Sequence, residues 1–300
     1  MKTGIVQMGS ARSLLRYAAR LAIAAPFAAL LCGPSPASAV PVPLLGTAQS
    51  FAVLGASTVT NTGPTLIYGD VGVYPGTALT GMGTAVITGG TQYPGIPPAD
   101  QAQADALTAF NILAAAPVSQ VLTGQDLGGM TLSPGVYQFA SSAQLTGTLI
   151  LDFASNPGSS FVFQIGSTLT TASNSLVNVL SGNENSGVYW EVGSSATLGT
   201  DTTFAGNIIA LASVTLNTGT SIMCGRAIAL TGAVTMDTNT ISNDCISESY
   251  STGRVDYGSE GFSGAGDNIP EPASLLLLAM GAMGVAAVRW AKSADQLRVA

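Results

Sequence analysis

Short apolar segments recur along the second half of the chain at a nearly constant spacing. Residues 196–202, 214–220 and 234–240 share the pattern x-Thr-apolar-x-Thr-x-Thr, and residues 206–211 and 225–230 form a second matching series. A repeat of about 19 residues, with short apolar strands between Gly, Ser, Asn and Thr, is typical of one coil of a parallel β-solenoid. Because one coil cannot bury its apolar side alone, we expect neighbouring coils to stack and share a core.

Apolar and polar residues alternate within each repeated strand, which assigns the two sides of the strand. We expect Leu198, Leu216 and Met236 to point into the core and Thr197, Thr215 and Thr235 to point outwards. Successive coils lie about 4.8 Å apart, so the outward threonines should form a ladder with that spacing. A second column, made of Thr200, Thr218 and Thr238, is predicted beside the first.

One segment breaks the β pattern and predicts a helix packed along the side of the solenoid. Residues 101–116 are rich in Ala and contain no Gly or Pro. Asp100 is the expected N-cap, and Pro117 is expected to end the helix. The apolar residues that recur at helical spacing are Ala106, Phe110 and Leu113.

Composition narrows the chemistry that this chain can perform. It has no His and only 9 Lys and Arg residues, and its net charge is −7. The absence of His excludes imidazole metal sites and catalysis by Ser-His or Cys-His pairs. Nucleic acid is excluded as a partner because phosphate binding requires Lys and Arg. Asp201, Asp237 and Asp244 are scattered in turns, and Arg226 is the only basic residue of the coils, so we expect no enzyme, metal or cofactor.

Residues 1–39 have the features of a secretory signal peptide. Basic residues precede a short apolar run at 21–31, and Ala37-Ser38-Ala39 forms a small-residue cleavage box. The exported chain is therefore expected to begin near Val40. It would retain Cys224 and Cys245, which lie about one coil apart and should form a disulfide in an oxidising compartment. We expect this disulfide to staple the last coil, which would otherwise fray for lack of a neighbour.

The C-terminal end carries a second export feature. Pro270-Glu271-Pro272 precedes an apolar run, and Arg289 and Lys292 follow it, which predicts a transmembrane helix over about 273–291. This order closely resembles the PEP-CTERM sorting signal of Gram-negative bacteria. The resemblance implies a transient inner-membrane anchor, cleavage by an exosortase-type processing enzyme, and a final location at the cell surface or outside the cell. A plain membrane anchor is the alternative. Residues 249–268, rich in Gly and Ser, are expected to be a flexible linker.

The domain over residues 40–248 is similar to the ice-binding protein-like family. The segments that carry this resemblance are 45–55, 60–63, 69–73, 132–137, 161–166 and 225–235. The resemblance implies a right-handed β-solenoid of triangular section, with a long helix lying along it and a flat Thr-rich face that binds ice. Thr77-Ala78-Leu79-Thr80 matches the Thr-Ala/Gly-x-Thr/Asn pattern that some members carry on that face.

Two functions remain open at this point. The first is a secreted or surface-displayed protein that contacts an ice crystal surface, with Thr77, Thr80 and the two predicted threonine columns as candidate contacts. Thr suits that role because its β-branched side chain is stiff at χ1 and keeps its hydroxyl in register. The second is a structural or adhesive protein of the extracellular matrix, with exopolysaccharide as a partner and no ice affinity. In that case Thr is simply a favoured exposed residue on strands.

Overall fold

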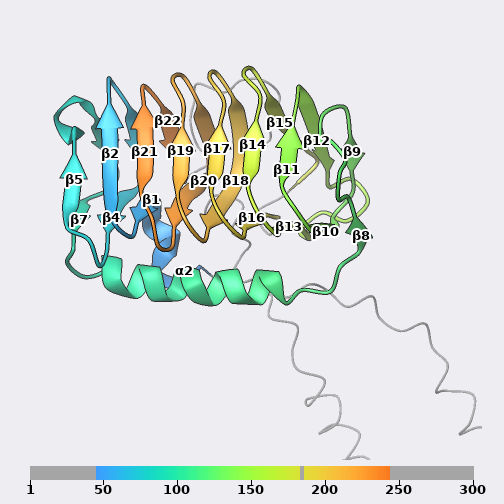
Figure 1. Ribbon diagram of the computed structural model, residues 1–300, viewed down its shortest axis with the longest axis horizontal. Helices are drawn as coiled ribbons and strands as arrows, with labels where there is room; N and C mark the ends of the chain where they lie inside the picture. Colours follow the sequence, from blue (N-terminus) through green and yellow to red (C-terminus); the bar gives the residue numbers. More distant parts are fainter. Residues whose placement is uncertain (1–44, 183–185, 244–300) are drawn as a thin grey trace, which may run out of the picture. The chain divides into compact units, whose positions relative to one another are not determined.

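The computed structural model describes residues 45–182 and 186–243, which form a β-solenoid with one α-helix (Figure 1). Its strands belong to a 7-stranded and a 15-stranded sheet, and every pairing between them is parallel. This confirms the expected parallel solenoid, while the handedness of its winding stays a prediction. No helix in the described part of the chain is long and apolar enough to cross a membrane. The signal peptide, the linker and the predicted helix at 273–291 lie outside the described residues.

The 7-stranded sheet forms one side of the solenoid, which we call the threonine face. In spatial order its strands are β11 (Ala143–Leu145), β14 (Leu169–Thr171), β17 (Ala196–Leu198), β19 (Val214–Leu216), β21 (Val234–Asp237), β2 (Thr58–Thr62) and β5 (Ala78–Thr80). Figure 1 shows these strands side by side along the length of the molecule.

The 15-stranded sheet bends around the other two sides. The side next to the helix contains β8 (Gln120–Val121), β10 (Gly135–Phe139), β13 (Ser160–Ile165), β16 (Gly187–Val192), β1 (Phe51–Gly55), β4 (Asp70–Val73) and β7 (Gln92–Pro94). The third side contains β9 (Thr131–Leu132), β12 (Thr148–Asp152), β15 (Leu176–Leu180), β22 (Thr240–Ser242), β3 (Leu66–Tyr68) and β6 (Val86–Thr88).

Two long strands, β18 (Thr203–Ala210) and β20 (Ser221–Ala229), turn the corner between these two sides. Gly206 adopts φ +97° at that corner, a conformation that favours glycine. A Cβ at Gly225 would stand 1.9 Å from the Gly206 carbonyl oxygen. Glycine in both coils therefore allows adjacent backbones to approach closely enough to continue the ladder.

The coils do not stack in the order of the sequence. β1 pairs with β20, β2 with β21, and β3 with β22, so the N-terminal coil lies against the C-terminal one. The expectation that the last coil lacks a neighbour was therefore wrong, because the N-terminal strands fill that place. Cys224 is disulfide-bonded. Cys245 lies outside the described residues, so their pairing stays a prediction.

The core widens towards the end of the solenoid that contains β10 and β13. The coils that link Gln144 to Thr170 and Thr170 to Thr197 are longer than the coil from Thr197 to Thr215. Aromatic rings fill the extra space, and the rings of Phe163 and Trp190 stack with centroids 3.9 Å apart. Burial of such large apolar side chains is a main source of stability in a core of this kind.

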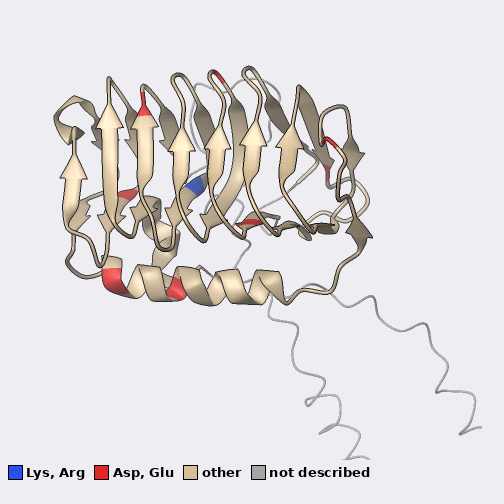
Figure 2. Cartoon of the chain, viewed as in Figure 1, with Lys and Arg blue, Asp and Glu red and all other residues tan. Residues whose placement is uncertain are grey.

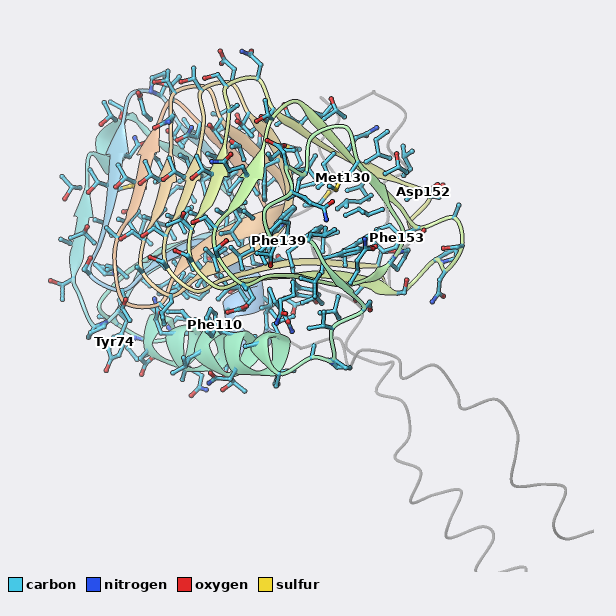
Figure 3. All side chains as sticks on the ribbon, turned by 45° about the vertical axis from the view of Figure 1, so that its right-hand side comes forward. Tyr74, Phe110, Met130, Phe139, Asp152 and Phe153 are labelled. Atoms are coloured by element: carbon cyan, nitrogen blue, oxygen red, sulfur yellow. The ribbon has the colours of Figure 1, made fainter. Side chains whose placement is uncertain are left out.

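Helix α2 (Ala99–Ala114) runs along the solenoid and buries the stripe of residues predicted for it. Ala106, Phe110 and Leu113 lie in one cluster with apolar residues of β10, β13 and β16, and Figure 3 shows Phe110 between helix and sheet. The helix begins earlier than expected. Pro98 precedes its first residue without a side-chain cap, so Asp100 is not the N-cap but lies in the first turn.

The C-terminal end of α2 is held by a buried polar side chain of the sheet. The Gln164 amide donates hydrogen bonds of 2.8 Å to the carbonyl oxygens of Leu113 and Ala116. These bonds satisfy carbonyl groups that a helix end leaves without partners. Glu191 is paired in register with Gln164 and is only 7% exposed. Burial raises the pKa of the Glu191 carboxyl to about 7, while a backbone hydrogen bond with Ile165 opposes that shift.

We expect Glu191→Gln to stabilise the domain at pH 8 but not at pH 4. Below the pKa of an unfolded glutamate, about 4.3, the carboxyl is neutral in both states and has no net effect. Between that value and 7 the folded state keeps a proton that the unfolded state releases, so stability falls as pH rises. Removing the charge should recover up to about 3 kcal/mol above pH 7. Thermal unfolding at both pH values checks this, and an equal effect at pH 4 and pH 8 would contradict it.

Candidate ligand-binding face

A column of outward side chains runs the full length of the threonine face. The cross-strand register places Thr170 opposite Thr197, Thr197 opposite Thr215, and Thr215 opposite Thr235. It continues through β2 and β5, where Thr235 lies opposite Thr60 and Thr60 opposite Thr80. In spatial order the column is Gln144, Thr170, Thr197, Thr215, Thr235, Thr60 and Thr80. Consecutive threonines therefore repeat at the coil spacing of about 4.8 Å.

A second outward column lies two residues before the first in each strand. Its members are all small: Ser142, Thr168, Ser195, Ser213, Ala233, Thr58 and Ala78. The Thr168 hydroxyl donates a 2.8 Å hydrogen bond to the Ser142 hydroxyl, and the Ala233 N–H donates to the Ser213 hydroxyl at 3.2 Å. Because this column contains no bulky side chain, its residues do not protrude beyond the threonines beside them.

The position of each threonine is fixed by the residues on either side of it. Val214 and Leu216 flank Thr215 and are buried in the core, as are Ala196 and Leu198 beside Thr197. The inward direction predicted for Leu198, Leu216 and Met236 is thus confirmed. The seven strands pair without a register shift. Buried residues on both sides and a stiff χ1 therefore hold Thr197 and Thr215 in their row.

The other predicted positions lie at the margin of this face. Thr200 and Thr218 lie level with each other in turns, since the Asp201 N–H donates to the Thr218 carbonyl. The Gly219 N–H donates in the same way to the Thr238 carbonyl, but it also donates to the Asp237 carbonyl. The register changes within this turn, because Leu216 lies opposite Met236 whereas Ser221 lies opposite Thr240. The predicted column of Thr200, Thr218 and Thr238 therefore lies in the turns at the margin of the face, and its register is irregular at Thr238.

The residues of Thr77-Ala78-Leu79-Thr80, the segment that matches the Thr-Ala-x-Thr pattern, occupy different parts of the surface. Thr80 stands at the end of the threonine column, Ala78 stands in the second column, and Thr77 precedes β5 as an exposed turn residue. Thr60 and Thr170 were missed by the sequence analysis, although both follow the same small-apolar-Thr pattern as the repeats.

Charge is almost absent from the threonine face (Figure 2). Asp237, at the end of β21, is the only Asp, Glu, Lys or Arg in its seven strands. Its carboxylate accepts hydrogen bonds from the hydroxyls of Thr218 and Thr238, which hold it at the turn. No group of three or more potential metal ligands occurs within residues 45–182 and 186–243. Apart from the amide of Gln144, the side chains of the two columns therefore offer a ligand methyl groups, hydroxyls and the water that these order.

Two family models match this chain. The model of the Ice-binding-like family matches residues 53–242, and that of the PEP-CTERM protein-sorting motif matches residues 268–289. An ice-binding protein of Nostoc sp. (strain HG1) is 56% identical over 209 residues, which are 70% of this chain and 77% of that one.

Solved structures agree with the sequence relatives. The crystal structure of an ice-binding protein from the Antarctic ascomycete Antarctomyces psychrotrophicus is 40% identical, with a TM-score of 0.63 over 67% of this chain and 98% of that one. An ice binding protein from an Antarctic biological consortium is 42% identical, with a TM-score of 0.63 over 67% and 90% of the two chains.

The parallel solenoid and its hydroxyl-bearing face are those of the ice-binding-like class of β-solenoid proteins, a non-enzymatic family. The chain belongs to the Ice-binding-like family. Its PEP-CTERM motif indicates export to the surface or exterior of a Gram-negative cell.

Proposed function

We propose that this protein binds ice through the threonine face. The observation that carries the proposal is the run of threonines from Thr170 to Thr80 in one unbroken register across six strands. Helix α2 packs on a different side of the solenoid and leaves this row to meet a ligand. The names of the relatives support the same ligand.

The chemistry of the face suits a surface of ordered water. The threonine methyl groups are weakly hydrophobic and exclude disordered water, while the hydroxyls hydrogen-bond to water held at regular spacing. Each such contact is weak, so binding depends on many contacts made at once. Flatness and area therefore matter more than any single hydroxyl.

Export would bring this face into contact with extracellular ice. We infer that residues 1–39 direct secretion, that 273–291 form a transient inner-membrane anchor, and that an exosortase-type enzyme recognises Pro270-Glu271-Pro272. The linker at 249–268 would hold the domain away from the surface until the tail is removed.

Thr215→Tyr should abolish most ice activity, whereas Thr215→Val should retain much of it. Thr215 lies in the middle of the column, so a bulky ring there would hold neighbouring threonines away from the crystal, while Val keeps the shape of Thr. Folding stability should change by no more than about 0.5 kcal/mol, because the side chain points outwards. Ice recrystallisation inhibition and thermal hysteresis measure the effect.

Thr148→Tyr is the matched control, because Thr148 is an exposed threonine on β12, outside the threonine face. It should leave ice activity unchanged. Full activity in a folded Thr215→Tyr protein would exclude this column as the site. A wild-type protein without ice activity would contradict the proposal itself and favour the structural or adhesive matrix role.

Deletion of Pro270-Glu271-Pro272 should leave the protein in the inner membrane with its C-terminal tail uncut. The deletion removes the box that the processing enzyme is proposed to read, but it keeps the apolar run. Cell fractionation and the mass of the protein check this outcome. Normal tail removal in the deletion strain would show that the box is not needed for recognition.

A further inference from the structure

Thr80 is the one threonine of the row that its neighbours in the chain do not anchor. Leu79 is only partly buried and Gly81 is exposed, whereas the residues on both sides of Thr60 are buried. Thr80 also belongs to a strand of three residues, β5, which pairs only with β2 among the described strands (Figure 1). A further contact is therefore needed to keep the end of β5 level with the rest of the row.

Asn61, on β2, supplies such a contact from inside the solenoid. Its side-chain amide donates hydrogen bonds of 3.2 Å to the Gly81 carbonyl and 3.1 Å to the Thr84 hydroxyl. The Thr84 hydroxyl donates in turn to the Gly81 carbonyl at 3.1 Å, and the same amide also donates to the Gly63 carbonyl at 3.0 Å. These bonds join β2 to Gly81 and to the turn η2 (Met82–Thr84), which follow directly on β5.

Asn61 is polar at a place where the neighbouring coils are apolar. It lies opposite Met236, and the same inward series continues with Leu216 and Leu198. Asn61 is only 5% exposed, and its side-chain oxygen has no hydrogen-bond partner among the described residues. Burial of such an amide costs stability that burial of an apolar side chain does not cost. Stability of the core therefore does not explain an amide at this position, whereas its bonds to the end of β5 do.

We propose that Asn61 is a positioning residue that holds Thr80 level with the rest of the row. Gly81 follows Thr80 directly, and it adopts φ +71° so close to β2 that a Cβ there would stand 1.9 Å from the Asn61 carbonyl oxygen. Without the side-chain bonds, β5 would be held to β2 only by its short ladder and by the partly buried Leu79. The effect on ice binding rests on the proposed function, whereas the effect on the order of β5 does not.

Asn61→Leu tests this role, because Leu has nearly the shape of Asn but donates no hydrogen bond. Leu already occupies the equivalent inward position in β17 and β19, so the variant should fold with a thermal stability close to that of the wild type. Hydrogen exchange in a peptide over residues 77–85 should become at least about tenfold faster. The protein concentration that halves ice recrystallisation should rise about twofold, because only one threonine leaves the row. Met236→Leu, an inward substitution that removes no hydrogen-bond donor, should change neither quantity.

A double substitution separates positioning from general damage to the fold. Thr80→Ala removes the threonine itself, so Asn61→Leu should cause no further loss of ice activity in that background if it acts through Thr80. An additive loss, or unchanged hydrogen exchange over residues 77–85, would overturn the proposal. A wild-type protein without ice activity would instead contradict the proposed function, and faster exchange in Asn61→Leu would still support the role of Asn61 in holding β5.

Discussion

Hydrogen bonds between the backbones of successive coils determine the position of every other feature of this protein. They set a repeat of about 4.8 Å, and they keep that repeat without a shift across the seven strands of the threonine face. The threonine column is a direct product of this register, because each strand contributes one Thr at the same level. Glycine at the corner between β18 and β20 and buried neighbours on both sides of every Thr in the row except Thr80 keep the register in place.

The register also suggests how a domain with so few charges could recognise a ligand. The threonine face carries one carboxylate, and that group is bound by two hydroxyls of its own turns. We therefore expect recognition to come from geometry, through repeated weak contacts along a row of fixed register. Helix α2 contributes indirectly. It packs on the apolar residues of another side of the solenoid, where Gln164 bonds to its C-terminal end, and so it leaves the threonine face uncovered.

Local patterns predicted the strands and the helix well, because alternation and helical spacing are properties of adjacent residues. The sequence repeats also placed Thr197, Thr215 and Thr235 in one row, as the structure confirms. The places of Thr60 and Thr80 in this row could not be predicted, although both follow the same local pattern as the repeats. They join the row only because the N-terminal coil pairs with the C-terminal one, and no local pattern predicts that long-range contact. The change of register in the turn at Thr238 was not predicted, because it depends on the length of that turn.

Thr60 offers the most direct measurement of the central claim, which is that one continuous row binds ice. It lies between Thr235 and Thr80, and because Thr235 is distant in sequence, only the folded register brings the two ends of the row together at Thr60. We expect folded Thr60→Tyr protein to be excluded from a slowly growing ice hemisphere that incorporates the wild type. Equal incorporation of the two proteins would contradict the account.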